Sequence, residues 1–116
     1  MALIPVTKVK EAVGAIAVPF VALTGADTLA APGNNLQTLV LQNDGASSAT
    51  IVVDGDGATA FNPGGIGKTV DLSAGYSIVV PAGESRAVSL ANIVRYLVGT
   101  INVTGGSADV KAAVIQ

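Results

Sequence analysis

The sequence has no cysteine and no histidine, and it is poor in charged and aromatic residues. Among its 116 residues there is no tryptophan, aromatics make up 3% and charged residues make up 12%. Without imidazole or thiol groups, the chain lacks the usual general base, the thiolate nucleophile and the ordinary zinc ligands. The fold also needs no disulfide, so nothing points to an oxidising compartment. We therefore expect a protein that is not an enzyme and that has no catalytic residues, no cofactor and no metal.

The charge is low and scattered along the chain. Six basic and eight acidic residues give a net charge of −2. Nucleic-acid binding needs a basic patch that follows the phosphates, and usually aromatic side chains on which bases stack. We therefore expect no nucleic-acid partner. Charged residues are about half as frequent as in an ordinary soluble domain, which predicts that other protein covers part of the surface.

The N-terminal region has some features of a targeting signal. Residues 12–23 are apolar and follow two lysines, as in a signal peptide. However, Glu11 flanks this stretch, Pro19 interrupts it, and it is too short to span a membrane. We expect instead an N-terminal arm over residues 1–12 that lies on a neighbouring subunit, one domain over residues 13–116, and no membrane partner.

After residue 35, short β-branched runs alternate with turns rich in glycine, asparagine and proline. The strands predicted from these runs cover residues 36–42, 49–53, 69–72, 76–80, 86–90, 95–103 and 108–115. Gly105 and Gly106 predict a hairpin between the last two strands, and one short helical turn is expected near residues 91–94. Short strands without intervening helices predict an all-β fold, either a single-domain antiparallel β-sandwich or a jelly-roll-like barrel, with an extended N-terminal arm.

Two glycine-containing motifs are similar to ligand-binding loops but have the wrong spacing. Residues 64–69 include the Gly-Lys-Thr of a phosphate-binding loop, but Asn62 stands where the motif must begin, and a strand is predicted where a helix is needed. Residues 54–57 alternate carboxylates as a calcium loop does, but Ala58 and Gly65 stand where further oxygen ligands are needed. We interpret the motifs as a glycine loop and a hairpin turn.

Few residues have the size and polarity to anchor a protein contact. Tyrosine and arginine are enriched among the residues that dominate interface energies, and an arm contributes apolar and basic residues. The candidate interface residues are Ile4, Pro5, Val6 and Lys8 in the arm and Tyr76, Arg86, Arg95 and Tyr96 in the domain.

Four segments together resemble a known family. They are the arm MALIPVTK at 1–8, the segment at 34–53, the Pro-Ala-Gly-Glu turn at 81–84 and the closing pair GTINVTGGSADVKAAVIQ at 99–116. This pattern resembles small β-structured virion proteins of tailed bacteriophages and prophages, which include capsid decoration, cement and minor capsid proteins. The glycine loop at 62–68 is longer than that pattern leads us to expect.

The resemblance implies a structural protein rather than an enzyme. It implies docking on the lattice of the major capsid protein, outside the assembled head, by a homo-oligomer that is expected to be a trimer. Synthesis in the host bacterial cytoplasm and residence on the virion exterior follow from it. Two alternatives remain: another virion module, of the tail, collar or fibre base, and a bacterial surface or carbohydrate-binding module. The latter commonly presents tryptophan or tyrosine to sugars, and this chain has two tyrosines and no tryptophan.

Overall fold

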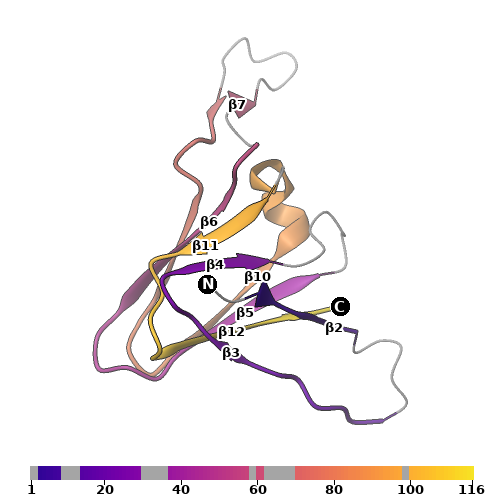
Figure 1. The fold of residues 1–116 in the computed structure, drawn as a ribbon, viewed down its shortest axis with the longest axis vertical. Coiled ribbons are helices and arrows are strands. Elements are labelled where there is room, and N and C mark those ends of the chain that lie inside the picture. The colour runs from indigo at the N-terminus through magenta and orange to yellow at the C-terminus, as the bar shows by residue number, and fades with distance from the viewer. Residues whose placement is uncertain (1–2, 9–13, 30–36, 58–59, 62–69, 98–99) are drawn as a thin grey trace.

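The computed structural model describes residues 3–8, 14–29, 37–57, 60–61, 70–97 and 100–116 (Figure 1). These residues form strands and one short 3₁₀ helix, η1 (Leu90–Tyr96). The strands are β1 (Leu3–Ile4), β2 (Val6–Thr7), β3 (Val21–Ala22), β4 (Ala26–Leu29), β5 (Thr38–Asn43), β6 (Ala49–Gly55), β7 (Ala60–Phe61), β8 (Val70–Asp71), β9 (Tyr76–Val80), β10 (Ser85–Ser89), β11 (Ile101–Thr104) and β12 (Val110–Ile115). In this part of the chain, no helix has the length and apolar character to cross a membrane.

Two five-stranded sheets pack face to face as a sandwich. Sheet A has the order β1-β4-β11-β6-β9, and sheet B has the order β10-β5-β12-β2, with β3 also paired to β12. A separate pair, β7-β8, lies beyond one end of the sandwich (Figure 1). The predicted all-β sandwich is confirmed, and neither sheet closes into a barrel in the described residues.

Eight of the strands form four nested pairs. Strand β6 pairs with β9, β5 with β10, β4 with β11 and β3 with β12, and every one of these pairs is antiparallel. The pairs alternate between sheet A and sheet B. A long hairpin that is wrapped in this way is the topology of a double-sheet jelly roll.

The predicted hairpin at Gly105 and Gly106 is wrong, because β11 and β12 belong to different sheets. The turn is a corner at which the chain crosses from one sheet to the other. A Cβ atom on Gly105 would lie 2.2 Å from the Thr50 carbonyl oxygen, and one on Gly106 would lie 2.6 Å from the Leu23 side chain. The two glycines are needed for this close crossing rather than for a two-residue hairpin.

The strand predicted over residues 95–103 needs correction. It begins only at Ile101, because residues 95 and 96 belong to η1. The short helical turn predicted near residues 91–94 is confirmed within η1, where Leu90 and Ile93 are buried. The predicted strands at 69–72 and 76–80 are neighbours in the sequence but do not pair with each other, because β8 pairs with β7 and β9 pairs with β6.

The start of the predicted arm is part of the sandwich. Strand β1 runs parallel to β4 in sheet A, and β2 runs parallel to β12 in sheet B. Both sheets are therefore mixed rather than purely antiparallel, and the chain changes sheets at Pro5. Residues 9–13 lie outside the described residues, so the predicted boundary after residue 12 stays a prediction.

The core lies between the sheets and contains the inward positions of both. Period-2 alternation predicts that Leu97, Gly99, Ile101 and Val103 share one face of their strand, and that Val110, Ala112 and Val114 share one face of theirs. The last five of these side chains are buried in β11 and β12, which confirms the prediction for them. Leu97 is also buried but precedes β11, and residue 99 lies outside the described residues. The remaining core is aliphatic, from Leu39 and Leu41 in β5 and from the facing strands of sheet A, with no aromatic residue fully buried in the described part.

We expect Gly105→Ala to destabilise the fold much more than Gly83→Ala. Both glycines have positive φ, but a Cβ atom on Gly83 meets nothing within 4 Å. Gly83→Ala should therefore cost about 1 kcal/mol, the penalty for left-handed backbone alone. Gly105→Ala should cost about 3 kcal/mol or more, because a backbone clash is added. Chemical denaturation of both variants measures the difference, and equal losses would show that the corner is looser than described.

Candidate interaction surface

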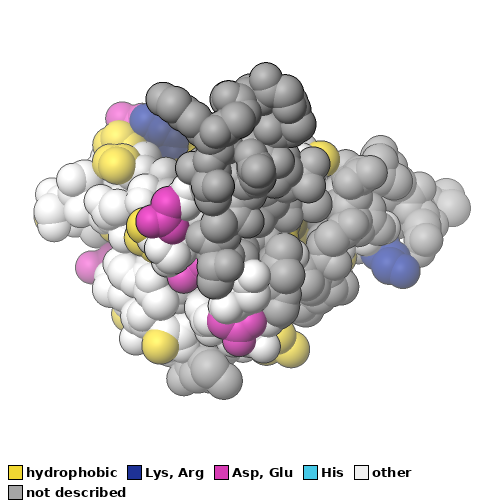
Figure 2. Space-filling view, turned by 90° about the horizontal axis from the view of Figure 1, so that it is seen from above, with side chains coloured by type: hydrophobic (Ala, Val, Ile, Leu, Met, Phe, Trp, Pro, Cys, Tyr) yellow, Lys and Arg dark blue, Asp and Glu magenta, His cyan; other side chains and the backbone are white. Residues whose placement is uncertain are grey.

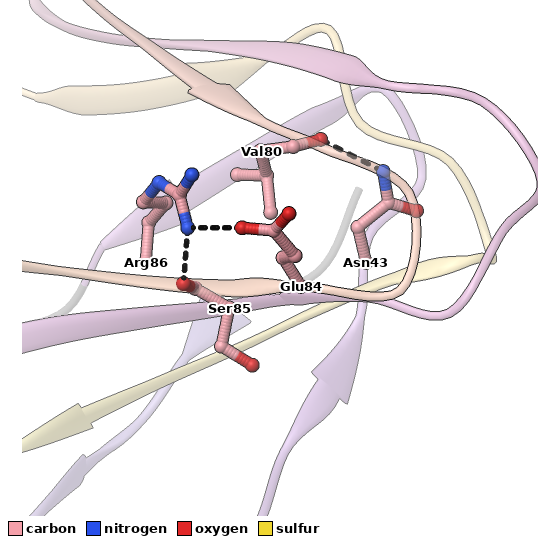
Figure 3. A network of polar contacts seen from close by, with 5 residues as sticks. All are labelled: Asn43, Val80, Glu84, Ser85 and Arg86. Atoms are coloured by element: carbon pink, nitrogen blue, oxygen red, sulfur yellow. Dashed lines mark hydrogen bonds and ion pairs between the residues drawn. The ribbon is translucent and has the colours of Figure 1, made fainter.

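A buried asparagine closes one end of the sandwich, next to one of the candidate residues. Asn43 is 2% exposed, and its Nδ2 atom donates to the Val80 carbonyl oxygen at 2.9 Å (Figure 3). The same atom donates to the Ser47 carbonyl oxygen, also at 2.9 Å. Its Oδ1 atom accepts a hydrogen bond from the Gly45 amide at 2.9 Å. Its backbone amide donates to the Glu84 carbonyl oxygen at 2.9 Å. The side chain therefore joins sheet B to the end of sheet A and positions the turn at 81–84.

Arg86 lies in the strand that follows this turn. Its Nη1 atom contacts Glu84 Oε1 and the Ser85 carbonyl oxygen, both at 2.9 Å (Figure 3). The two charged side chains are 43% and 55% exposed, so the pair is worth at most about 1 kcal/mol. Arg86 is accessible, and its charge is balanced locally by Glu84.

The two candidate tyrosines contact each other. The ring centroids of Tyr76 and Tyr96 are 5.7 Å apart and the rings are tilted by 59°. Both side chains are half-buried and pack against the core. Tyr76 begins β9 and Tyr96 ends η1, whereas Arg86 follows the turn at the other end of β9, so the tyrosines and Arg86 do not form one patch. The side chain of Arg95 lies outside what the structure describes.

The arm candidates differ in exposure. Ile4 is 0% exposed and belongs to the core of its own chain, so it is removed from the candidate interface. Pro5 and Val6 are half-buried, and Lys8 is exposed. Residues 3–7 are thus held by sheet pairing within the chain, and the arm predicted to lie on a neighbouring subunit does not begin there.

The residues at 54–57 serve a structural role in the described part. Asp54 lies in β6, on the outer face of sheet A, and Asp56 Oδ1 accepts a hydrogen bond from the Thr100 amide at 2.9 Å. The Asp56 amide in turn donates to the Thr100 carbonyl oxygen. Among the described residues there is no group of three carboxylates that could hold a metal ion. The Gly-Lys-Thr motif lies outside the described residues.

Asp71 also has a local role. Its Oδ1 atom accepts hydrogen bonds from the Ser73 hydroxyl at 2.6 Å and the Ser73 amide at 2.9 Å, which lower the pKa of this exposed carboxyl. The arrangement is an Asx-turn that leads from β8 towards β9.

The outer face of sheet A is almost free of charge. Strand pairing places small polar and aliphatic side chains there in cross-strand rows, and Asp54 is the one charged residue among them. Two large apolar side chains stand at its opposite edges, Leu3 in β1 at 62% exposure and Val79 in β9 at 56%. The face consists of Leu3, Ala26, Thr28, Thr50, Val52, Asp54, Ser77, Val79, Asn102 and Thr104.

Elsewhere the described charged side chains stand singly or in pairs and form no larger cluster. Lys111 on the outer face of sheet B is paired with Asp44 at 2.6 Å. Figure 2, which views the molecule from above, shows the described acidic and basic side chains in separate small spots, without a continuous area of one sign on the side turned to the viewer. A surface of this kind favours contact with another uncharged protein surface over electrostatic capture of a charged partner.

Residues 14–20 form a second exposed apolar feature. This segment, Gly-Ala-Ile-Ala-Val-Pro-Phe, lies outside every strand and runs beside the sandwich towards β3 (Figure 1). Ile16 is 42% exposed and Phe20 is 37% exposed. The sequence marked residues 12–23 as apolar, but neither residues 14–20 nor the outer face of sheet A was predicted to be an interaction surface.

In the comparisons with known proteins, no family model, no curated protein and no solved structure matched the chain.

We expect Asn43→Asp to destabilise the sandwich by about 3 kcal/mol, because it replaces two buried donors by an oxygen that faces two carbonyl oxygens. Asn92→Asp makes the same chemical change on an exposed residue of η1 and should change stability by less than about 0.5 kcal/mol. Urea unfolding measures both. A loss at Asn43 no larger than that at Asn92 would mean that the corner does not depend on the amide.

Proposed function

We propose that the chain is a non-enzymatic capsid decoration protein of a tailed bacteriophage, which binds the outside of the assembled head as a homo-oligomer, expected to be a trimer. Made in the host bacterial cytoplasm, it stabilises the lattice of major capsid proteins through many identical protein contacts. The observation that carries the proposal is the broad, nearly uncharged outer face of sheet A, with Leu3 and Val79 exposed.

Exposed apolar side chains at both edges of this face support docking onto protein. Removing apolar area from water is favourable by about 25 cal/mol for each Å², and the part of this gain that exceeds the entropy cost of association contributes to affinity. The polar side chains of the face are mainly threonine, serine and asparagine, which exchange hydrogen bonds with water for hydrogen bonds with a partner. With Asp54 as its one charged residue, the face loses little hydration energy on docking.

The fold is consistent with this role by analogy. Double-sheet jelly rolls recur in virion proteins, although a fold alone does not establish a function. A partner that binds only the assembled lattice stabilises it by mass action. In an oligomer, several weak contacts act together, so a modest affinity for each site is sufficient.

Two other functions are alternatives to this proposal, and experiments can distinguish them from it. A tail, collar or fibre-base module has the same surface requirements but a different place on the particle. A bacterial surface or carbohydrate-binding module would bind glycans, for which the half-buried Tyr76 and Tyr96 offer little free ring surface. Specific glycan binding by the purified chain would favour this last alternative.

We expect the purified chain to sediment with capsids that lack it, and Val79→Asp to weaken that binding about tenfold, which is about 1.4 kcal/mol per site. A carboxylate on this face would be buried without a partner in the complex. Ala82→Asp adds the same charge at an exposed position of the turn at 81–84, away from the face, and should bind as the natural chain does.

Thermal unfolding of both variants controls for loss of the fold. If Val79→Asp binds capsids as well as Ala82→Asp does, the outer face of sheet A is not the docking surface. If the natural chain does not bind assembled capsids at all, the proposed function is wrong.

A further inference from the structure

Among the described residues, one edge of sheet B has no neighbouring strand, because β10 pairs there with β5 alone. The Asn43 amide donates to the Glu84 carbonyl oxygen and the Leu90 amide donates to the Gln37 carbonyl oxygen, which shows which residues of β10 bond to β5. Because antiparallel pairing alternates along a strand, Ser85, Ala87 and Ser89 direct their backbone groups away from β5. Their side chains are small and uncharged, so another backbone can approach closely.

The apolar segment at 14–20 has the pattern of a strand without a partner. Its larger side chains, Ile16, Val18 and Phe20, alternate with small ones, as on the two faces of a strand. Within the described part of the chain, no backbone hydrogen bond joins residues 14–20 to another residue. Unpaired backbone along an exposed apolar strand is suited to pairing with the edge of another sheet.

Pro19 selects the side of the segment that can pair. Proline has no amide hydrogen, so it is tolerated in an edge strand only where its nitrogen faces away from the neighbouring strand. In an extended segment, this requirement leaves Ile16 and Val18 with their backbone groups directed at the partner strand. A seven-residue segment spans about 24 Å, which exceeds the length of about 17 Å of a five-residue strand, so it is long enough to cover all of β10.

The segment and the open edge lie on opposite sides of sheet B. The segment leads directly into β3, which pairs with β12, and β5 lies between β12 and β10. In its described part, one chain therefore carries an unpaired extended segment at one edge of this sheet and an open strand edge at the other. Two different surfaces that fit each other make a head-to-tail contact, which forms a closed ring when the rotation between copies permits.

We propose that residues 14–20 of one copy add as a strand to the free edge of β10 in a second copy, so that sheet B continues from subunit to subunit. The contact buries Ile16 and satisfies backbone groups on both chains. This inference does not depend on the proposed function, and it is tested on the purified chain without capsids.

The first test is the molar mass in solution by light scattering during gel filtration. The natural chain should form an oligomer whose mass is a multiple of 11.4 kDa. Ile16→Glu should dissociate it, because a carboxylate enters the buried side of the contact. Ala17→Glu is the matched control, since this side chain lies on the opposite face of the segment, and it should leave the oligomer intact. A natural chain that is monomeric at every concentration overturns the proposal, as does equal behaviour of the two variants.

The second test locates the contact and uses the absence of cysteine from the natural chain. Chains with Ala17→Cys and chains with Ala87→Cys are mixed and treated with a short bismaleimide. The expected product is a cross-linked pair that contains one chain of each kind and forms only in the mixture. Cross-linking of Ala87→Cys chains alone would show that two β10 edges pair with each other, which overturns the proposal. If Ile16→Glu weakens capsid binding while the free chain is a monomer, the segment binds the capsid lattice and the proposal is also wrong.

Discussion

The sandwich depends on closing its end without leaving buried polar groups unpaired. Asn43 meets this constraint, because its amide group bonds the Val80 and Ser47 carbonyl oxygens and the Gly45 amide at once. At 2% exposure, water is not available to replace those bonds. The same residue holds the turn at 81–84, which carries the chain from β9 in sheet A to β10 in sheet B. The position of β10, and therefore of the open edge of sheet B, follows from this corner.

Local sequence patterns predicted the elements better than they predicted the connections. Alternation identified the buried faces of β11 and β12, because it depends only on which side of a strand meets the core. The glycine pair at 105 and 106 correctly marked a turn, but a turn signal does not encode whether the next strand returns in the same sheet or crosses to the other. The parallel pairing of β1 with β4 and of β2 with β12 joins segments that are far apart in the sequence, and no local pattern predicts it.

The candidate interface residues were chosen by residue type, and type alone is a weak guide to exposure. Tyr76 and Tyr96 pair with each other, and Ile4 fills the core. Val79 was missed because residues 78–80 are all apolar, so the sequence does not show which of them faces outward. In the structure, side chains alternate along β9, and Val79 points away from the core between the buried Ile78 and Val80. The alternation of Ile16, Val18 and Phe20 was visible in the sequence, but its meaning depended on knowing that this segment has no partner strand in the described part of its own chain.

The central claim is that the chain coats the outside of a capsid, and the most direct measurement is its copy number in purified particles. Particles from the source phage or induced prophage are analysed by quantitative mass spectrometry against the major capsid protein. The account predicts about one copy per capsid subunit or a simple fraction of that number, since each docking site repeats with the lattice. A handful of copies per particle would place the chain in the tail, collar or fibre base, and its absence from particles would contradict the account altogether.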